Sequence, residues 1–464
     1  MSAEKELARE LLDSLEHFFM RHRVFFRMSE RNIMRRSMRK LRSVGKLSPK
    51  EGERLLVALK RASSRAHIPS PTATVFRMIK RLSAEGVDVL FNSFKKELIK
   101  RMRELKEKKE KVKIVFMFGS GASRPPPSNI PTVNEMLDYL VGNLPPTEIP
   151  FASKVKDWAS RNGINIEDIL TAGYLGTLLV SKPIVNKLVG EIIYRELEDE
   201  AELREREYVF SFQDLVGRVF SMVSGLMAKA DSNIVHESVA NLIKNSQNDE
   251  LLEFSVTTTN YDVCVEKAFE KSDLKYRYLG IDGKEGIPLV KIHGSINWFY
   301  CEGCQSVVTY SIKELERFKK IFPTSGSCQK CGTPASLLMV PPIAYKYVMF
   351  PILIDIWQAA MRTIEEADII VVIGYSFGLA DDYIFKMVVS SIKKKSSTLV
   401  LLDKEFSSIE NLKNKLLAYH LKLPYPIIGD AEETVPVMVK AIKEAKTSVA
   451  KETREPKKTK KRKK

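Results

Sequence analysis

The chain has 464 residues, of which 44% are hydrophobic, and it carries a formal net charge of +17. This length exceeds what one simple hydrophobic core accommodates, so several domains are expected. No stretch approaches the ~20 consecutive apolar residues that a membrane-spanning helix needs, and acidic residues near the N-terminus exclude a secretory signal peptide. The composition therefore predicts a cytoplasmic protein without a membrane span.

Residues 1–108 have the pattern of a basic helical region without strands. Arginines recur there at every fourth position. Because residues four apart on a helix differ by only ~40° in direction, these arginines form one stripe, with an apolar face opposite. The stripe is either a solvated helix face or a surface for a polyanion such as nucleic acid, ribosomal RNA or acidic lipid, and the second reading is favoured. The stripe, called the arginine stripe below, consists of Arg23, Arg27, Arg31, Arg35 and Arg39.

The last segment, residues 451–464, reads KETREPKKTKKRKK and holds nine basic and two acidic residues. It has almost nothing apolar to bury, so it is expected to be a disordered polybasic tail. Stripe and tail together favour a nucleic-acid or ribosome partner.

From Lys111 on, the pattern becomes that of an open α/β sheet. The apolar segment KVKIVFMF ends in small residues, which is typical of a buried parallel strand that turns into a phosphate-binding loop. Further short apolar segments are FSVTTTNYD, PLVKIHGS, ADIIVVIGYSF, STLVLLD and PYPIIGD. They predict an α/β fold with a Rossmann-like parallel sheet over residues 109–450, with a helical insertion at about 151–247.

Three of these segments end in residues suited to a nucleotide site. After the first strand, glycines at the first and third loop positions let the backbone approach a diphosphate closely. Asn260 and Asp262 end a second segment, and His293 ends a third, followed by small residues that leave room for a substrate. Ligands bind at the carboxyl ends of the strands in open α/β sheets. The glycine-rich loop consists of Gly119, Ser120, Gly121, Ala122 and Ser123.

Four of the five cysteines form two CxxC pairs separated by 23 residues. Two such pairs can converge on one tetrahedral zinc ion, and four thiolates leave no open coordination position. A structural zinc module is therefore expected at about residues 299–334, with an iron–sulfur cluster as the alternative. The expected ligands are Cys301, Cys304, Cys328 and Cys331, whereas the fifth cysteine, Cys264, is expected to fill core space.

In order along the chain, GSGAS, TNYD, KIHGS, the paired CxxC motifs, Gly374-Tyr375-Ser376 and IIGDAEETVPVMV resemble the sirtuin family. The resemblance runs from about Lys111 to Ala445 and is nearest to the divergent branch of NAD-consuming proteins. It implies NAD as the ligand, with the glycine-rich loop and Ser376 at its phosphates, Gly374 beside Ser376 as a further cofactor-binding residue, and Asp403 at the adenosine ribose. It also implies that Asn260 orients water or the nicotinamide amide, that Asp262 supports it, and that His293 acts as a base.

The sequence departs from the sirtuin deacetylases at two places, and both concern what accepts the cleaved ADP-ribosyl group. RPPPSNIPTVNEML follows the glycines, and LLMVPP stands where the family has a strand that pairs with a peptide. The two prolines of LLMVPP have no backbone N–H and so cannot donate hydrogen bonds to a paired peptide strand. NAD hydrolysis to nicotinamide and ADP-ribose is therefore slightly favoured over lysine deacylation, and a third possibility is a non-catalytic nucleic-acid-binding or ribosome-binding nucleotide sensor. An oligomer is compatible with each of these functions.

Overall fold

The computed structural model describes residues 3–22, 26–44, 87–142, 223–283, 285–315, 325–340, 351–378, 381–404 and 425–454, with scattered positions between 47 and 59, at 153 and 157, and between 412 and 421. The chain divides into two compact units. The first comprises Met1–Lys100, Asp403–Asn411 and Tyr425–Lys464, and the second comprises Arg101–Leu402 and Leu412–Pro424. None of the described helices is long and apolar enough to cross a membrane.

The first unit begins with two packed helices, α1 (Ala3–His22) and α2 (Met28–Val44), as the sequence predicts. Their shared core includes Leu11, Leu15, Phe19, Phe26 and Met34. Met34, Met38 and Leu41 of α2 are buried, whereas Arg35 and Arg39 are exposed on the other side of the helix. The amphipathic pattern of the sequence therefore predicted the orientation of α2 correctly.

The first unit also contains β11 (Tyr425–Ile428), α17 (Ala431–Arg454) and most of α5 (Val87–Glu107). Lys95 of α5 and Glu444 of α17 form an ion pair at 2.8 Å. Because α17 continues to Arg454, residues 451–454 are helical, which corrects the expected start of the disordered tail. The remaining tail residues lie outside the described part of the chain, as does most of the expected helical insertion.

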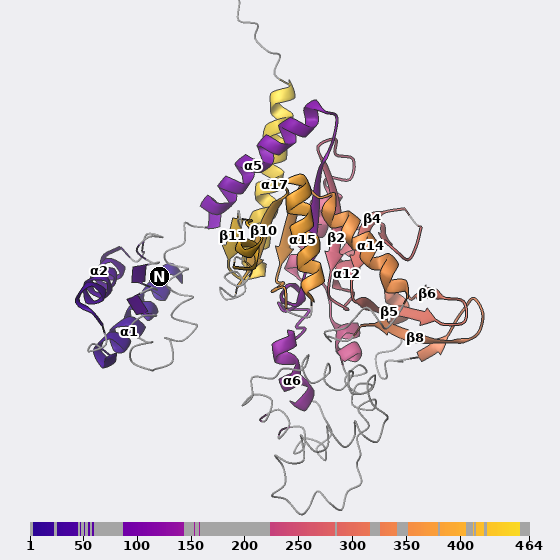
Figure 1. The fold of residues 1–464 in the computed structure, drawn as a ribbon, viewed down its shortest axis with the longest axis horizontal. Coiled ribbons are helices and arrows are strands. Elements are labelled where there is room, and N and C mark those ends of the chain that lie inside the picture. The colour runs from indigo at the N-terminus through magenta and orange to yellow at the C-terminus, as the bar shows by residue number, and fades with distance from the viewer. Residues whose placement is uncertain are drawn as a thin grey trace, which may run out of the picture. The chain divides into compact units, whose positions relative to one another are not determined.

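The second unit is built on parallel strands, which run in the order β10-β9-β1-β2-β4-β3. All five pairings between neighbours in this order are parallel, as predicted for the Rossmann-like sheet (Figure 1). The continuous apolar runs in the sequence correspond to the central strands, which are covered on both faces. The strands are β1 (Val112–Phe118), β2 (Leu252–Thr258), β3 (Tyr276–Tyr278), β4 (Ile287–Lys291), β9 (Ile369–Ile373) and β10 (Thr398–Asp403).

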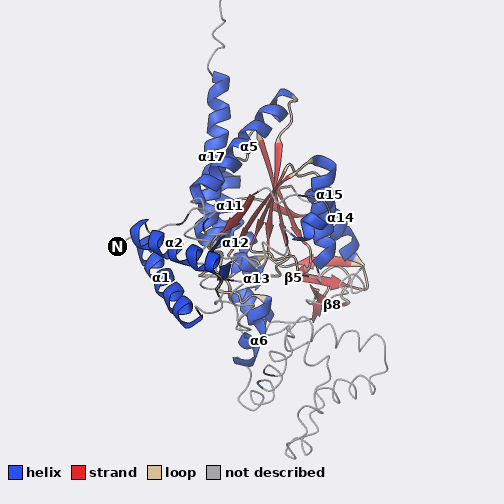
Figure 2. Cartoon of the chain, turned by 60° about the vertical axis from the view of Figure 1, so that its left-hand side comes forward, coloured by secondary structure: helices blue, strands red, loops and turns tan. Residues whose placement is uncertain are grey.

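Helices lie on both faces of this sheet. Figure 2 shows α14 (Ile352–Glu365) and α15 (Asp382–Lys395) on one face, with α11 (Ile234–Lys244) and α12 (Cys264–Lys271) on the other. Shorter helices follow β1 and β6: a 3-10 helix at Ser120–Ser123, α6 (Val133–Gly142) and α13 (Ile312–Leu315). This arrangement is the doubly covered α/β layer structure that the alternating strand and helix patterns predicted.

A second, antiparallel sheet follows β4 and has the order β6-β5-β8-β7. Strand β5 of this sheet is buried along its whole length, and Gly294 at its start adopts a φ of 84°. A Cβ there would lie 2.1 Å from the Leu338 carbonyl oxygen, so this close strand crossing requires glycine. The strands are β5 (Gly294–Cys301), β6 (Ser306–Thr309), β7 (Ser325–Ser327) and β8 (Pro334–Met339).

Candidate functional site

The glycine-rich loop packs directly against the loop that follows β9. A Cβ on Gly119 would lie 2.5 Å from the Cβ of Tyr375, and one on Gly121 would lie 2.8 Å from the Cα of Gly374. The Gly121 N–H donates to the Gly374 carbonyl at 2.9 Å. The glycines therefore allow two strand ends to meet, and the Gly121 N–H is already used within the protein.

The loop does not present all of its side chains to solvent. Ser120 and Gly121 are half-buried, whereas Ala122 and Ser123 are fully buried. The Ser123 hydroxyl donates to Asp262 Oδ2 at 2.9 Å, so Ser123 holds the protein together at this point. Ser123 was expected among the residues at the diphosphate, but its side chain faces the interior.

Asn260 follows β2 at the edge where the strands end. Its Nδ2 donates to the Gly119 carbonyl and to the Ser123 hydroxyl, both at 3.0 Å. With Nδ2 fixed in this way, Oδ1 is left as the acceptor of the amide. Asp262 is buried, and its Oδ1 accepts from the Cys264 N–H at the start of α12. The structure therefore brings Asn260, Asp262 and the glycine-rich loop together.

His293 follows β4, the strand next to β2. Its Nδ1 lies 3.2 Å from the Thr259 carbonyl oxygen, which can only accept, so Nδ1 carries the proton. In the neutral ring, Nε2 is then the basic atom, and it accepts from the Tyr383 hydroxyl at 2.7 Å. The neighbouring Asn260 and His293 are thus linked through the backbone of Thr259.

Asp381 and Tyr383 were not singled out in the sequence, although they lie just beyond Gly374-Tyr375-Ser376. Asp381 Oδ1 lies 3.3 Å from His293 Nε2, and Asp381 Oδ2 accepts from the Tyr375 hydroxyl at 2.9 Å. Burial raises the pKa of Tyr383, which keeps it a hydroxyl donor. The negative charge of Asp381 stabilises the imidazolium that forms when His293 takes up a proton.

A second residue that the sequence did not single out is His236 of α11. Its Nε2 lies 3.4 Å from the Ser123 hydroxyl. Ser376 is exposed, whereas Asp403 ends β10 and is buried. The site residues that the structure brings together are therefore those that follow β1, β2, β4 and β9.

A buried ion pair lies behind Asn260 and His293. Lys291 of β4 and Glu266 of α12 are both fully buried, with Nζ and Oε1 2.9 Å apart. Lys291 also donates to the Asp262 carbonyl, and Tyr278 donates its hydroxyl to Glu266 at 3.0 Å. These bonds connect the strand that carries His293 to the loop that carries Asn260.

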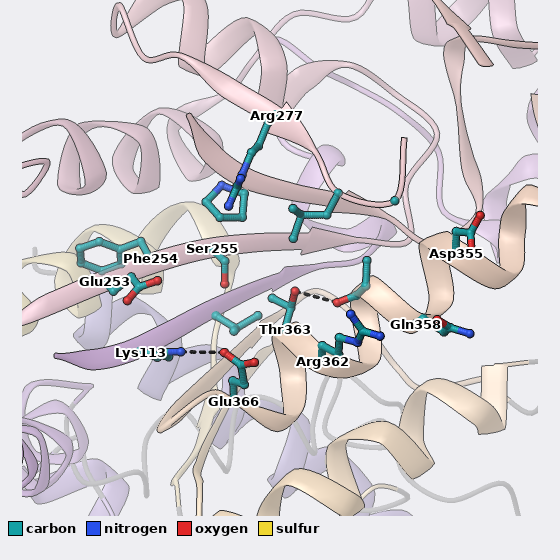
Figure 3. A pocket seen from close by; sticks show the side chains of 15 residues that line it. Lys113, Glu253, Phe254, Ser255, Arg277, Asp355, Gln358, Arg362, Thr363 and Glu366 are labelled. Atoms are coloured by element: carbon teal, nitrogen blue, oxygen red, sulfur yellow. Dashed lines mark hydrogen bonds and ion pairs between the residues drawn. The ribbon is translucent and has the colours of Figure 1, made fainter. Parts of the chain in front are cut away.

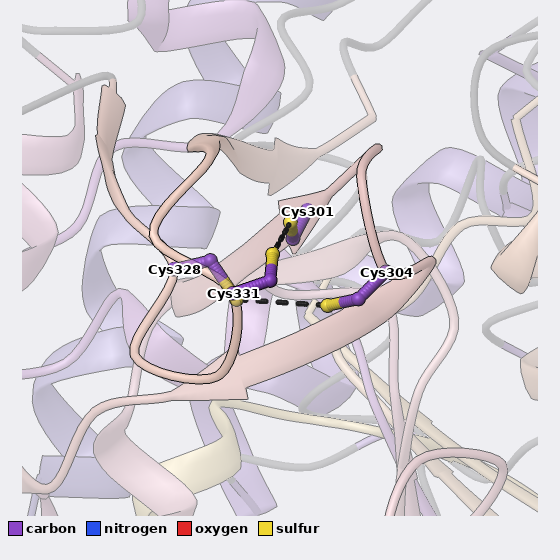
Figure 4. A group of neighbouring side chains, drawn as sticks. All are labelled: Cys301, Cys304, Cys328 and Cys331. Atoms are coloured by element: carbon purple, nitrogen blue, oxygen red, sulfur yellow. Dashed lines mark hydrogen bonds between the residues drawn. The ribbon is translucent and has the colours of Figure 1, made fainter.

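The four predicted cysteine ligands converge at one end of the antiparallel sheet (Figure 4). Their sulfur atoms all lie within 4.8 Å of one another, with Cys301 and Cys331 at 3.4 Å and Cys304 and Cys328 at 3.6 Å. Tetrahedral zinc with Zn–S bonds of about 2.3 Å separates its sulfur ligands by about 3.8 Å. The cluster therefore fits one structural zinc ion.

The environment of the cysteines favours thiolates at two positions. A hydrogen bond with Thr333 lowers the pKa of Cys301 to about 6, and backbone N–H groups lower the pKa of Cys328. By contrast, burial raises the pKa of Cys264 well above its usual value. Cys264 is completely buried, which confirms its predicted role as a core residue.

A cavity of about 480 Å³ lies on the same sheet but toward the other ends of the strands. Its lining includes Lys113 and Glu253, which stand at the beginnings of β1 and β2, together with Arg277 and Arg362. Lys113 and Glu366 form an ion pair within it at 2.6 Å (Figure 3). Because parallel strands place their beginnings and ends at opposite edges, this cavity is separate from the site of Asn260 and His293.

Comparison with known proteins agrees with this architecture. Residues 190–380 match the model of the Sir2 family, a span that includes Asn260, His293, the four clustered cysteines and Gly374. The search of curated proteins gave no match. The parallel sheet, its two helix layers and the four-cysteine module define a Rossmann-like α/β protein with an inserted metal module. By this match, residues 190–380 of the chain are similar to the Sir2 family.

Solved structures similar to the chain include three complexes of Sir2 proteins. A mutant Sir2 homologue with ADP-ribose is 17% identical, with 76% of this chain and 97% of that chain covered and a TM-score of 0.39. Sir2 bound to an acetylated peptide is 16% identical, with 73% and 97% covered and a TM-score of 0.33. A Sir2–p53 peptide–NAD+ complex is 14% identical, with 70% and 92% covered and a TM-score of 0.35.

Proposed function

We propose that the chain binds NAD at the carboxyl ends of β1, β2, β4 and β9 and cleaves its nicotinamide–ribose bond, with water as the favoured acceptor. The observation that carries the proposal is the arrangement of Asn260 and His293. The two side chains follow adjacent parallel strands, and hydrogen bonds fix which atom of each remains an acceptor.

The chemistry needs orientation, a base and little else, because nicotinamide departs as a good leaving group. Asn260 Oδ1 accepts from the attacking water or from the nicotinamide amide and so orients it at the anomeric carbon. His293 Nε2 takes up the proton of the ribose hydroxyl or the water. Asp381, 3.3 Å away, stabilises the resulting imidazolium. Tyr383 must release Nε2 when a substrate hydroxyl takes its place.

The phosphates of NAD are assigned to the half-buried part of the glycine-rich loop, Ser120 and Gly121, and to Ser376. The buried side chain of Ser123 is assigned to the support of Asn260 and Asp262 instead. Asp403 is assigned to the adenosine ribose, because an acidic side chain at the end of a strand accepts hydrogen bonds from ribose hydroxyls. The four cysteines are assigned a structural zinc ion.

Product analysis separates hydrolysis from deacylation. The protein is incubated with NAD, with and without an acetylated lysine peptide, and the products are separated. Nicotinamide and free ADP-ribose formed without peptide support hydrolysis, whereas O-acyl-ADP-ribose formed only with peptide supports deacylation. His293→Asn should abolish turnover, and the matched variant His420→Asn, at an exposed position, should leave it unchanged. Equal turnover in all three proteins contradicts the proposed base.

The arginine stripe supports a second proposed function, binding of a polyanion such as DNA or structured RNA. Arg27, Arg35 and Arg39 are exposed on α2, and Arg31 is half-buried with its Nε bonded to the Phe26 carbonyl at 2.9 Å. Arg23 lies outside the described residues. Exposed arginines at regular spacing meet phosphates without reading bases, so little sequence preference is expected.

A further inference from the structure

Helix α11 is capped at its N-terminus by a reciprocal pair of hydrogen bonds. Asn233 Oδ1 accepts from the backbone N–H groups of Val235 and His236, and His236 Nδ1 lies 3.5 Å from the Asn233 N–H. The backbone N–H can only donate, so His236 Nδ1 must be the unprotonated nitrogen. This cap therefore selects one tautomer of a buried histidine.

The same histidine faces the site with its other nitrogen. His236 is 2% exposed, and burial lowers its pKa to about 4, so the ring is neutral at ordinary pH. With Nδ1 unprotonated, Nε2 carries the hydrogen, and it lies 3.4 Å from the Ser123 hydroxyl. His236 thus donates to Ser123.

The hydrogen bond from His236 in turn determines the direction in which the Ser123 hydroxyl donates. A hydroxyl has one hydrogen to donate and two lone pairs to accept with. The Ser123 hydroxyl accepts from His236 Nε2 and from Asn260 Nδ2, and it donates to Asp262 Oδ2 at 2.9 Å. All three positions are occupied, and each has only one allowed direction.

We propose that His236 is a positioning residue that fixes the direction of this hydrogen-bond chain and so presents Asn260 Oδ1 to the substrate. A Ser123 hydroxyl without the His236 donor has a free lone pair and can rotate away from Asp262. Asn260 Nδ2 then keeps the Gly119 carbonyl as its one fixed acceptor among these groups, which lowers the cost of turning the amide over. A turned amide presents a donor to the substrate in place of the acceptor Oδ1. The inference rests on the proposed NAD cleavage, because Asn260 acts in that reaction.

Two variants separate the role of His236 in the site from its role in the helix cap. Asn at position 236 is long enough to accept from the Asn233 N–H but too short to reach Ser123. Gln has the reach of the histidine Nε2 and carries an amide donor there. His236→Asn should therefore lower kcat for NAD cleavage by about ten- to a hundredfold with KM changed less than threefold, whereas His236→Gln should stay within about threefold of the parent.

The melting temperature of each variant is measured beside the kinetics. Full kcat in His236→Asn, or an equal fall of kcat in both variants with both still folded, overturns the proposal. A fall in kcat confined to His236→Asn, with restoration by Gln, supports it. A variant that does not fold is replaced by Ser123→Ala, which removes the same relay point and should lower kcat with little change in KM.

The hydrogen-bond series from His236 to Asn260 is also tested without turnover. The protein is labelled with ¹⁵N at its six histidines, long-range ¹H–¹⁵N spectra are recorded, and the His236 signals are assigned by their absence from the His236→Gln variant. A single Nε2–H tautomer for His236 at neutral pH supports the proposed direction, and an Nδ1–H tautomer or a mixture overturns it. If the parent protein does not cleave NAD, the proposed function fails, while this spectrum still decides whether the hydrogen-bond chain exists.

Discussion

Acid should destabilise the protein through His236 at a pH above the range where most carboxylates titrate. Burial lowers the pKa of this histidine from 6.5 to about 4, although the charges of Asp262 and Glu237 oppose the shift and that of Lys291 adds to it. Between these values the unfolded chain binds a proton that the folded protein does not. The stability from this group is therefore complete above pH 6.5 and is lost as the pH falls toward 4.

The size of this loss of stability follows from the difference between the ordinary histidine pKa of 6.5 and the lowered pKa of about 4 for His236. At 1.36 kcal/mol per pKa unit the full loss is about 3 kcal/mol, of which about 2 kcal/mol has occurred by pH 5. Urea unfolding at pH values from 7.5 to 5 measures it, with His236→Gln as the non-titrating control. The parent should lose about 2 kcal/mol more than the variant over this range. Equal losses would refute the reasoning, because every other titrating group is common to both proteins.

Three further outcomes are expected at the other features. Asn260→Ala should lower kcat about a hundredfold with little change in KM, measured by steady-state NAD cleavage, because it removes an orienting group. Cys328→Ser should lose zinc by metal analysis and melt at a lower temperature, whereas Cys264→Ala should keep its zinc; a zinc-free parent contradicts the assignment. Deletion of residues 455–464 should weaken DNA binding and flatten its dependence on salt, since each neutralised phosphate contributes ~0.9 to the slope; an unchanged slope in gel-shift titrations speaks against the tail as a partner surface.

The parallel sheet could be predicted because its strands are short apolar runs that end in small or polar residues. The six apolar segments from KVKIVFMF to PYPIIGD all form strands. The same reasoning placed Asn260 and His293 at one edge, since adjacent parallel strands end together. The four-cysteine cluster could be predicted as well, because the spacing of the two CxxC pairs by itself limits the ways in which the four cysteines can meet.

The residues that were missed depend on contacts distant in sequence. His236 is separated from Ser123 by 113 positions, and a histidine at the third position of a helix has no pattern that marks it as a donor to a distant serine. Asp381 and Tyr383 lie after β9 and contact His293 after β4, although β1 and β2 stand between these two strands in the sheet. The available signal for this pair was the occurrence of polar residues within seven positions after Ser376 of the Gly-Tyr-Ser segment.

Lys291 shows how a sequence pattern can mislead about burial. A lysine at the end of an apolar segment is usually at the surface, yet Lys291 is fully buried because Glu266 of α12 lies opposite it. The pair is expected to fix the position of β4 relative to α12 and to add little to the net free energy of unfolding. The desolvation of the two charges costs about as much free energy as their mutual attraction provides.

This reasoning makes a prediction about single and double variants of the pair. Lys291→Met leaves the Glu266 carboxylate buried without its cation, and the expected loss is about 3–5 kcal/mol of unfolding free energy. Adding Glu266→Leu removes the stranded charge, so the double variant should regain most of that loss in urea unfolding at pH 7.5. It should not regain full NAD turnover, because Lys291 also donates to the Asp262 carbonyl and holds the loop of Asn260. A double variant no more stable than Lys291→Met would show that the loss came from packing, and full turnover in it would show that Asn260 is held without Lys291.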